Sequence, residues 1–175
     1  MIGLNKDVVE IYPYDKNWIK EFEKEKKILE NILKDYDIKI EHVGSTSIPN
    51  LSAKPIIDIA IGTKDEQTLF KIADILIKNG YDVLDNYQTK GEILARKGPP
   101  KCRTHYIHMQ LIDSEYWNEF IFFKRYLIEH PQEIKRYQEL KIKLSKEFSS
   151  DRKRYTQEKN EYISNILKKA YKLYK

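Results

Sequence analysis

Cysteine is almost absent from this chain, since Cys102 is the one thiol among 175 residues. A single thiol excludes an internal disulfide and is typical of a reducing compartment. Long apolar runs are missing as well: no stretch approaches the roughly 18 residues that a membrane span requires, and residues 1–10 lack the hydrophobic region of a signal peptide. We therefore expect a cytoplasmic protein with no membrane partner.

A strong charge of either sign is also missing. The chain carries 32 basic and 27 acidic residues, which leaves a formal net charge of +5. Most of these charges can pair on solvated faces, and the mild positive excess suits a phosphate ligand. Nucleic-acid binding would predict a dense basic stripe, and residues 152–154 with the surrounding lysines are the nearest approach to one. We rank a nucleic-acid partner last.

The length and the apolar content set the scale of the fold. With 175 residues, of which 41% are hydrophobic, the chain can form one domain with its own core. We expect a single domain over residues 1–175, whose C-terminal portion from about residue 114 is helical by pattern.

The stretch from residue 41 to residue 61, EHVGSTSIPNLSAKPIIDIAI, combines the features of an anion-binding turn. A short apolar strand ends at residue 43, Gly44 allows a tight turn, and Ser45 brings a hydroxyl beside free backbone amides. Residues 46–49 predict the start of a short helix, whose exposed N–H groups suit a phosphate. Gly44, Ser45 and Thr46 are therefore candidate ligand contacts, with a plain tight turn as the alternative.

The returning strand, residues 55–61, carries one carboxylate, Asp58, among four isoleucines and an alanine. A charged side chain in an apolar strand is costly unless it is paired, hydrogen-bonded or bound to a metal. An acid close behind an anion site is what a metal-nucleotide site requires, because a Mg²⁺ ion held by the acid can bridge to phosphate oxygens. Asp58 is thus a candidate catalytic residue and metal ligand; the alternative is an acid that caps neighbouring backbone.

A predicted hairpin supplies a second group of candidates. It pairs residues 92–96 with residues 104–112 around the Lys-Gly-Pro-Pro turn at 97–100. The period of two places Tyr106, His108 and Gln110 on one polar face. If that face looks toward Asp58, His108 is a metal ligand or a proton carrier. A histidine hydrogen-bonded within a half-buried sheet explains the same pattern.

The partner strand offers two more candidates by the same alternation. Glu92, Leu94 and Arg96 share a face, so Glu92 is a candidate for a second carboxylate and Arg96 for a phosphate contact. Exposed hairpin charges are the alternative for both.

The rest of the pattern predicts the supporting elements. A strand over residues 8–12 precedes a long amphipathic helix that begins near Asp15, a suitable N-cap, and reaches residue 33. Strands at 38–43 and 81–86 and a helix at 65–79 follow. Beyond Ser114 one helix runs to Pro131, a second runs to residue 148, and a cap at residues 149–151 starts a last helix.

That last helix carries Tyr155 and, one turn later, Lys159. Tyr-x-x-x-Lys also occurs in short-chain dehydrogenases, but no G-x-G-x-x-G turn follows a strand in this sequence. Nothing else in the chain favours hydride transfer. A core tyrosine and a surface lysine are the alternative for this pair.

Together these runs resemble the GrpB-like family, within the nucleotidyltransferase superfamily, whose members are also found fused to dephospho-CoA kinase. The likeness rests on HVGSTSIPNLSAKPIIDI at 42–59, on the Arg-Thr-His run at 103–105 ahead of the strand with His108, on FKRYLIEHP at 123–131 and on RYTQEKNEYI at 154–163. It extends over most of the chain. The resemblance implies an α+β fold: a nucleotidyltransferase-like mixed sheet flanked by helices, with a helical C-terminal portion. It further implies that Lys159 points toward the ligand, and the same runs add Lys54 and Arg103 as candidate ligand contacts.

Two positions depart from the pattern of active nucleotidyltransferases. Those enzymes usually carry Asp-x-Asp or Asp-x-Glu on the second strand, because residues i and i+2 share a face and hold two metals jointly. This chain has Asp58-Ile59-Ala60, so the second acid is missing. Relatives also tend to have two histidines on the later strand, where this chain has Tyr106 and His108.

We expect a protein that binds a nucleotide or another phosphorylated small molecule, with Mg²⁺ as its cofactor. The reaction that the resemblance implies is nucleotidyl transfer, in which His108 or Glu92 would be the base that activates an acceptor hydroxyl. The rival is a non-catalytic module that kept the fold and acts as a ligand sensor or as a partner of another enzyme. Ala60 favours this rival. No oligomeric state follows from the pattern.

Overall fold

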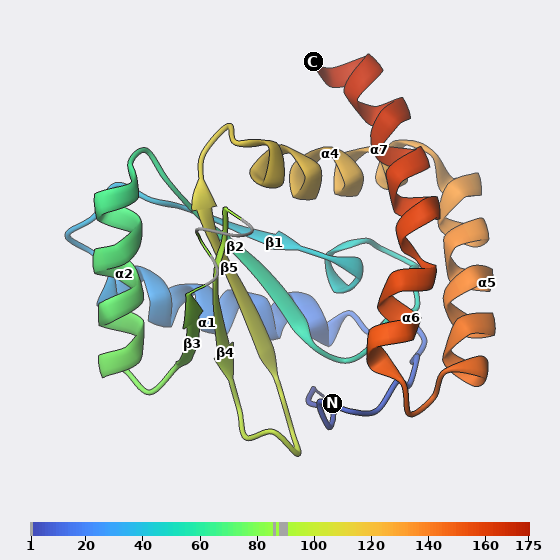
Figure 1. Ribbon diagram of the computed structural model, residues 1–175, viewed down its shortest axis with the longest axis horizontal. Coiled ribbons are helices and arrows are strands. Elements are labelled where there is room, and N and C mark those ends of the chain that lie inside the picture. The colour runs from blue at the N-terminus through green and yellow to red at the C-terminus, as the bar shows by residue number, and fades with distance from the viewer. Residues whose placement is uncertain (1, 86, 88–90) are drawn as a thin grey trace.

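A computed structural model describes residues 2–85, 87 and 91–175, and its centre is a five-stranded sheet (Figure 1). The strands are β1 (Lys39–Val43), β2 (Ile57–Thr63), β3 (Asp82–Asp85), β4 (Ile93–Lys97) and β5 (His105–Leu111). Their order across the sheet is β1-β2-β5-β4-β3. The β2/β5 pair is parallel and the other neighbours are antiparallel, so the sheet is mixed.

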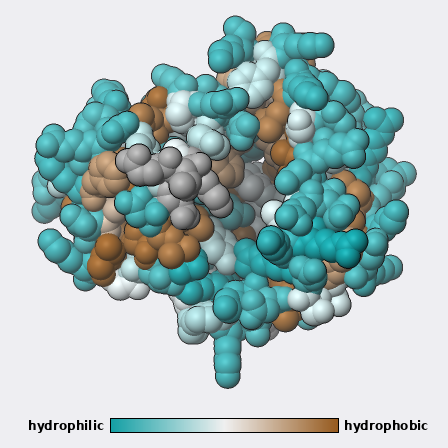
Figure 2. Space-filling view, in the orientation of Figure 1, coloured by the Kyte–Doolittle hydropathy of each residue, from teal (hydrophilic) through white to brown (hydrophobic). Residues whose placement is uncertain are grey.

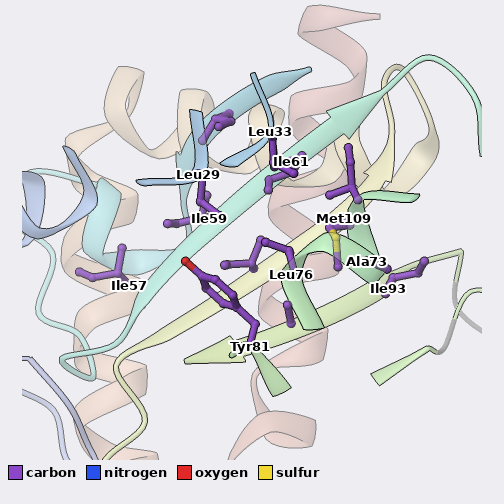
Figure 3. Close-up of a cluster of buried hydrophobic side chains, with 14 of the residues drawn as sticks. Leu29, Leu33, Ile57, Ile59, Ile61, Ala73, Leu76, Tyr81, Ile93 and Met109 are labelled. Carbon is purple, nitrogen blue, oxygen red and sulfur yellow. The ribbon is translucent and has the colours of Figure 1, made fainter. Parts of the chain in front are cut away.

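Two helices cover one face of this sheet, α1 (Asn17–Ile32) and α2 (Glu66–Lys78). Alternation along β2 sends Ile57, Ile59 and Ile61 to this face, where each is fully buried. They pack with apolar side chains from both helices and from β4 and β5 into the main core, which Figure 3 shows in close-up. Because β2 is buried on both sides, its sequence is almost continuously apolar.

The C-terminal helices and the turn that follows β1 lie on the opposite side of the sheet, and the first of these helices packs directly on it. These elements are η1 (Ser45–Ser47), α4 (Glu115–Glu129), α5 (Pro131–Glu147), α6 (Arg152–Glu158) and α7 (Asn160–Tyr174). Trp117 of α4 packs on Val43 and Ala60, which fixes this helix on β1 and β2. In Figure 1, α5, α6 and α7 lie together beside the sheet rather than over its centre.

The N-terminal segment, residues 2–16, runs along the molecule without forming a strand. The predicted strand at 8–12 is therefore wrong: only Tyr12 pairs, in an isolated bridge with Ala53. The reason is that Val9 packs between Leu144 and Tyr155 of the C-terminal helices, so no second strand lies along this segment. Asp15 accepts the N–H of Asn17 at 2.9 Å at the start of α1.

The predicted fold class is confirmed, because the chain forms an α+β structure with a mixed sheet between helices. The predicted strand at 81–86 is found as β3, and Asn86 lies outside the described residues. The last helix was predicted as one and is two. Lys159 separates α6 from α7, and its N–H bonds the carbonyl of Gln157 instead of continuing the helical ladder. Over the described ranges, no helix has the length and apolar character of a membrane span.

Candidate functional site

The turn after β1 lies directly against the carboxylate of Asp58. Gly44 has a φ of 67°, a conformation that side chains rarely adopt. A Cβ added at Gly44 would lie 2.5 Å from Asp58 Oδ2. Glycine thus permits both the turn and its close approach to the acid. Beside it, His42 Nε2 and Thr46 Oγ1 are 3.0 Å apart, which ties the end of β1 to η1.

His108 joins two carboxylates, one on β2 and one just before β4. Its Nδ1 lies 2.6 Å from Glu92 Oε1, and its Nε2 lies 3.4 Å from Asp58 Oδ1. We call these three residues the acid-imidazole triad. Burial on its own would lower the pKa of His108, but the hydrogen bonds with Asp58 and Glu92 outweigh it and raise that pKa to about 9. Both ring nitrogens therefore act as donors near neutral pH.

Four cations line a cavity together with Asp58 and Glu92 of the triad. This basic cluster consists of Lys54, Lys141, Lys159 and Arg152. The Nζ atoms of Lys54 and Lys159 lie 5.4 and 4.4 Å from the centre of the Tyr155 ring. Lys141 is 2% exposed and donates to the carbonyl of Ser52. Among the described residues, no carboxylate lies within ion-pair distance of these three lysines.

The pKa values of the three lysines in the basic cluster are lowered, which favours their neutral form. Burial lowers the pKa of Lys54 to about 7, with the nearby charges of Arg152 and Lys159 adding to the effect. Burial lowers the pKa of Lys159 to about 8, although Asp58 opposes that shift. The pKa of Lys141 falls well below its usual range for the same reason. A bound anion would reverse these shifts, because it stabilises the ammonium form.

The cavity has a volume of about 390 Å³ and lies between the sheet and the C-terminal helices. On the face drawn in Figure 2, a hollow near the centre separates the side of the sheet from the side of these helices. Beyond the charged groups, the cavity walls are aromatic and aliphatic. The contributing residues include Tyr116, Phe120, Phe123, Ile163 and Leu167.

Most of the residues predicted from the sequence meet in this cavity. Its lining includes Gly44, Ser45, Thr46, Lys54, Asp58, Glu92 and Lys159, and His108 lies just behind Asp58 and Glu92. These residues come from the turn after β1, from η1 and the segment that follows it, from β2, from the position before β4, from β5 and from the α6–α7 junction.

Two predicted ligand contacts lie elsewhere. Arg96 and Arg103 both pair with Asp82 Oδ2, each at 2.7 Å, and neither lines the cavity. Arg103 also donates to the carbonyl of Gly98 at 2.7 Å, which closes the turn between β4 and β5. Their charge is therefore used to hold the hairpin and the edge strand together, and we no longer count them as ligand contacts.

Sequence reasoning missed Lys141, which lies deepest in the cluster. It occupies the i+4 position after Tyr137 and the i−3 position before Leu144, and all three are buried. A lysine that interrupts the buried stripe of a helix was the available signal. Arg152 was noted only as part of a basic run, yet it donates to the hydroxyl of Tyr106 at 2.8 Å inside the cavity.

The expected magnesium ion is a poor fit for these donors. His108 lies between the two carboxylates that would hold a metal, and Ala60, on the same face as Asp58, packs against Trp117. Within the described ranges, no group of three or more His, Cys, Asp and Glu side chains is arranged to bind a metal. The expectation of His108 as a metal ligand runs against this geometry, because both of its nitrogens are engaged by acids.

A family model described as GrpB protein matches residues 8–169. The chain belongs to the GrpB family. It is 34% identical over 171 residues to the glutamate-rich protein GrpB of Alkalihalophilus pseudofirmus, a match that covers 95% of this chain and 98% of that protein. It is 33% identical over 162 residues to the UPF0157 protein YqkA of Bacillus subtilis, covering 93% of this chain and 47% of that protein. The fusion with dephospho-CoA kinase stays an expectation.

Solved structures agree with this assignment. A crystal structure of the conserved protein GrpB from Enterococcus faecalis superposes with a TM-score of 0.85 at 33% identity, covering 94% of this chain and 99% of that one. The Cid1 poly(U) polymerase, in a crystal structure with MgGTP bound, reaches a TM-score of 0.51 at 13% identity, covering 74% of this chain and 42% of that one. At such low identity the likeness to Cid1 is one of fold, and it confirms the nucleotidyltransferase-like arrangement.

Proposed function

We propose that the cavity binds a nucleotide or a related phosphorylated small molecule. The observation that carries this proposal is the basic cluster: three half-buried or buried lysines and an arginine converge on one cavity, without carboxylates in ion-pair distance of the lysines over the described ranges. Buried charges are costly unless they are compensated. An anionic ligand would supply the missing compensation.

The lining of the cavity supports a ligand with two unlike parts. It combines the donors of the basic cluster and Ser45 with the apolar surface of Phe120 and neighbouring side chains. A phosphate joined to a ring, as in a nucleotide, matches both kinds of lining. The nucleotidyltransferase-like fold is consistent with this ligand class.

The proposal is tested by titrating the pure protein with ATP, CTP, GTP and UTP and following the melting temperature. A ligand at about 100 times its Kd stabilises by about 2.7 kcal/mol, which raises the melting temperature of a chain of this size by roughly 5–10 °C. We expect Lys159→Met to lose most of this rise. Lys153→Gln removes an exposed positive charge that does not line the cavity and should keep it. The absence of any rise with all four nucleotides would contradict the proposal.

Nucleotidyl transfer is the second candidate, and the position of Glu92 favours it. Asp58 and Glu92 approach the same imidazole, so two carboxylates lie close together even though Ala60 replaces the usual second acid. If the chain is a transferase, it should release pyrophosphate from a nucleotide in the presence of Mg²⁺ or Mn²⁺ and a hydroxyl acceptor, and Asp58→Asn should abolish the release. Equal, background release by both proteins would favour the sensor or partner module.

A further inference from the structure

The two carboxylates of the acid-imidazole triad are already engaged within the protein. A histidine that lies between two carboxylates offers one ring nitrogen to each, which occupies one side of both acids. His108 has this environment, with Glu92 at 2.6 Å and Asp58 at 3.4 Å. The side chain of His108 is 17% exposed, and Phe120 packs on it with 4.8 Å between ring centres. The carboxylates that could attract a divalent ion are thus already in contact with the imidazole ring that lies between them.

The neighbouring positions leave little room for a replacement ligand set. Ala60, the Cα partner of His108 on β2, is fully buried against Trp117. On the other side of His108, β4 contributes Leu94. Neither side chain can coordinate a metal, so the face of the sheet around the triad offers no further donor at these two positions.

Positive charge is instead gathered on the helical side of the cavity. Lys54 follows the turn after η1, Lys141 projects from α5, and Lys159 lies where α6 meets α7. Arg152 completes the cluster, and its guanidinium lies over the Tyr106 ring at 5.1 Å while donating to the hydroxyl of that residue. Cations held this close to one another in a poorly solvated cavity repel, and a ligand with several negative charges relieves that repulsion more than a ligand with one.

We infer that the cavity takes a polyphosphate group free of divalent metal, with the basic cluster supplying the positive charge that magnesium supplies in metal-dependent sites. This inference rests on the proposed function, because it specifies the form in which the phosphorylated ligand binds. A magnesium ion on the polyphosphate would cancel ligand charge that the lysines need. It would also find the two carboxylates of the triad already in contact with His108.

Calorimetric titration with inorganic tripolyphosphate and with ATP, each in EDTA and in excess Mg²⁺, tests the inference. We expect binding in EDTA and an affinity that falls at least fivefold when Mg²⁺ is in excess. Inorganic phosphate should bind more weakly than tripolyphosphate. Binding that requires Mg²⁺, or that Mg²⁺ strengthens, would overturn the inference and leave the proposed function standing. Absence of binding under both conditions would overturn the inference, and it would overturn the proposed function as well if CTP, GTP and UTP also fail to bind.

Lys141→Met provides the matching variant, since it keeps the apolar stem and removes the buried charge. Its affinity for tripolyphosphate in EDTA should fall at least tenfold, whereas Lys153→Gln should stay within twofold of the unmodified chain. Folding of Lys141→Met is checked by its melting temperature, and Lys159→Met serves as a second variant at a less buried position. Unchanged affinity in both lysine variants would overturn the assignment of the basic cluster.

Discussion

Gly44 determines how closely the turn after β1 approaches Asp58. Two effects combine at this position: a φ of 67°, and a Cβ position that would lie 2.5 Å from Asp58 Oδ2. Gly80 provides a natural comparison, because its φ is 83° and no atom lies within 4 Å of the position its Cβ would take. Comparing Gly44 with Gly80 therefore separates the cost of backbone strain, which both share, from the cost of contact with Asp58, which only Gly44 has.

Replacing each glycine by alanine should give different losses of stability. Gly80→Ala should cost about 1–2 kcal/mol, the strain of a left-handed residue. Gly44→Ala should cost this amount plus about 1–3 kcal/mol for the forced displacement of Asp58. Denaturant unfolding of both variants measures the difference. Equal losses would mean that the turn can move away from the acid without cost.

His42 should make the protein sensitive to acid. Burial lowers its pKa from 6.5 to about 4, and the charge of Lys124 adds to the shift. Between these two values the unfolded chain binds a proton that the folded chain does not, so the free energy of unfolding falls as the pH drops from 6.5 to 4. The full shift corresponds to roughly 3 kcal/mol.

The measurement is the pH dependence of unfolding for the unmodified chain and for His42→Gln. We expect the difference between the two curves to change by roughly 3 kcal/mol across this window and to be flat above pH 7. A difference that does not vary with pH would show that His42 is solvated when protonated. The comparison removes the common contribution of other buried groups, such as His105, whose pKa burial also lowers.

At single residues, alternation along strands predicted the orientation of the triad. It did not predict which partner the charged side chain of Arg96 would bind. Asp58, Glu92 and His108 share a face because a strand has a period of two, which requires no tertiary information. Arg96 lies on the same face by the same alternation, but it does not reach the cavity because it forms an ion pair with Asp82 on β3. That pairing depends on which strand lies at the sheet edge, and the sequence alone does not determine the strand order.

At the scale of elements, α6 is the short helix on which the basic cluster depends. It carries Arg152 and Tyr155, and Lys159 follows its end. Asp151 caps its N-terminus by accepting the N–H of Arg154 at 3.0 Å. A helix of this length is marginal without its cap and its packing.

Loss of this cap should weaken ligand binding without removing any ligand contact. Asp151→Ala should cost about 1 kcal/mol of stability and reduce nucleotide affinity several-fold, because α6 positions the cations. Asp65→Ala removes the equivalent cap of α2, where Asp65 accepts the N–H of Thr68 at 2.8 Å on the far side of the sheet. It should cost the same stability and leave affinity unchanged. Equal affinities for the two variants, measured by calorimetry, would contradict the dependence on α6.

Periodicity predicted most of the elements, and the exceptions have a common cause. Helices with a continuous apolar stripe and strands with alternation were found close to their predicted positions. The break at Lys159 and the missing strand at 8–12 were not predicted, because the local pattern there is compatible with either outcome. Contacts with residues far along the chain, such as Val9 with Leu144, decide between them.

At the scale of the whole molecule, the cavity joins the sheet to the C-terminal helices. Its lining comes from the turn after β1, from the strands and from α4 to α7. A bound ligand would therefore contact parts of the chain that otherwise meet through few elements.

Hydrogen exchange should detect a ligand that contacts both the turn after β1 and the C-terminal helices. With a nucleotide at about 100 times its Kd, amides that exchange by opening of the cavity should slow by up to about 100-fold, both at residues 44–54 and at residues 152–163. Amides of α2 that exchange by local fraying should not change, since this helix lies on the other face of the sheet. Protection of only one of the two segments would mean that the ligand does not bridge them.

The distribution of the cavity lining along the chain, from residue 44 to residue 167, also has a consequence during synthesis. The sheet can assemble once β5 has emerged from the ribosome, while α6 and α7 are still to be made. During that interval the face that carries Asp58, His108 and Gln110 is open to water. Polar and charged side chains on an uncovered strand face discourage association with other nascent chains. We therefore expect the groups that later surround the ligand to reduce aggregation of the half-made protein.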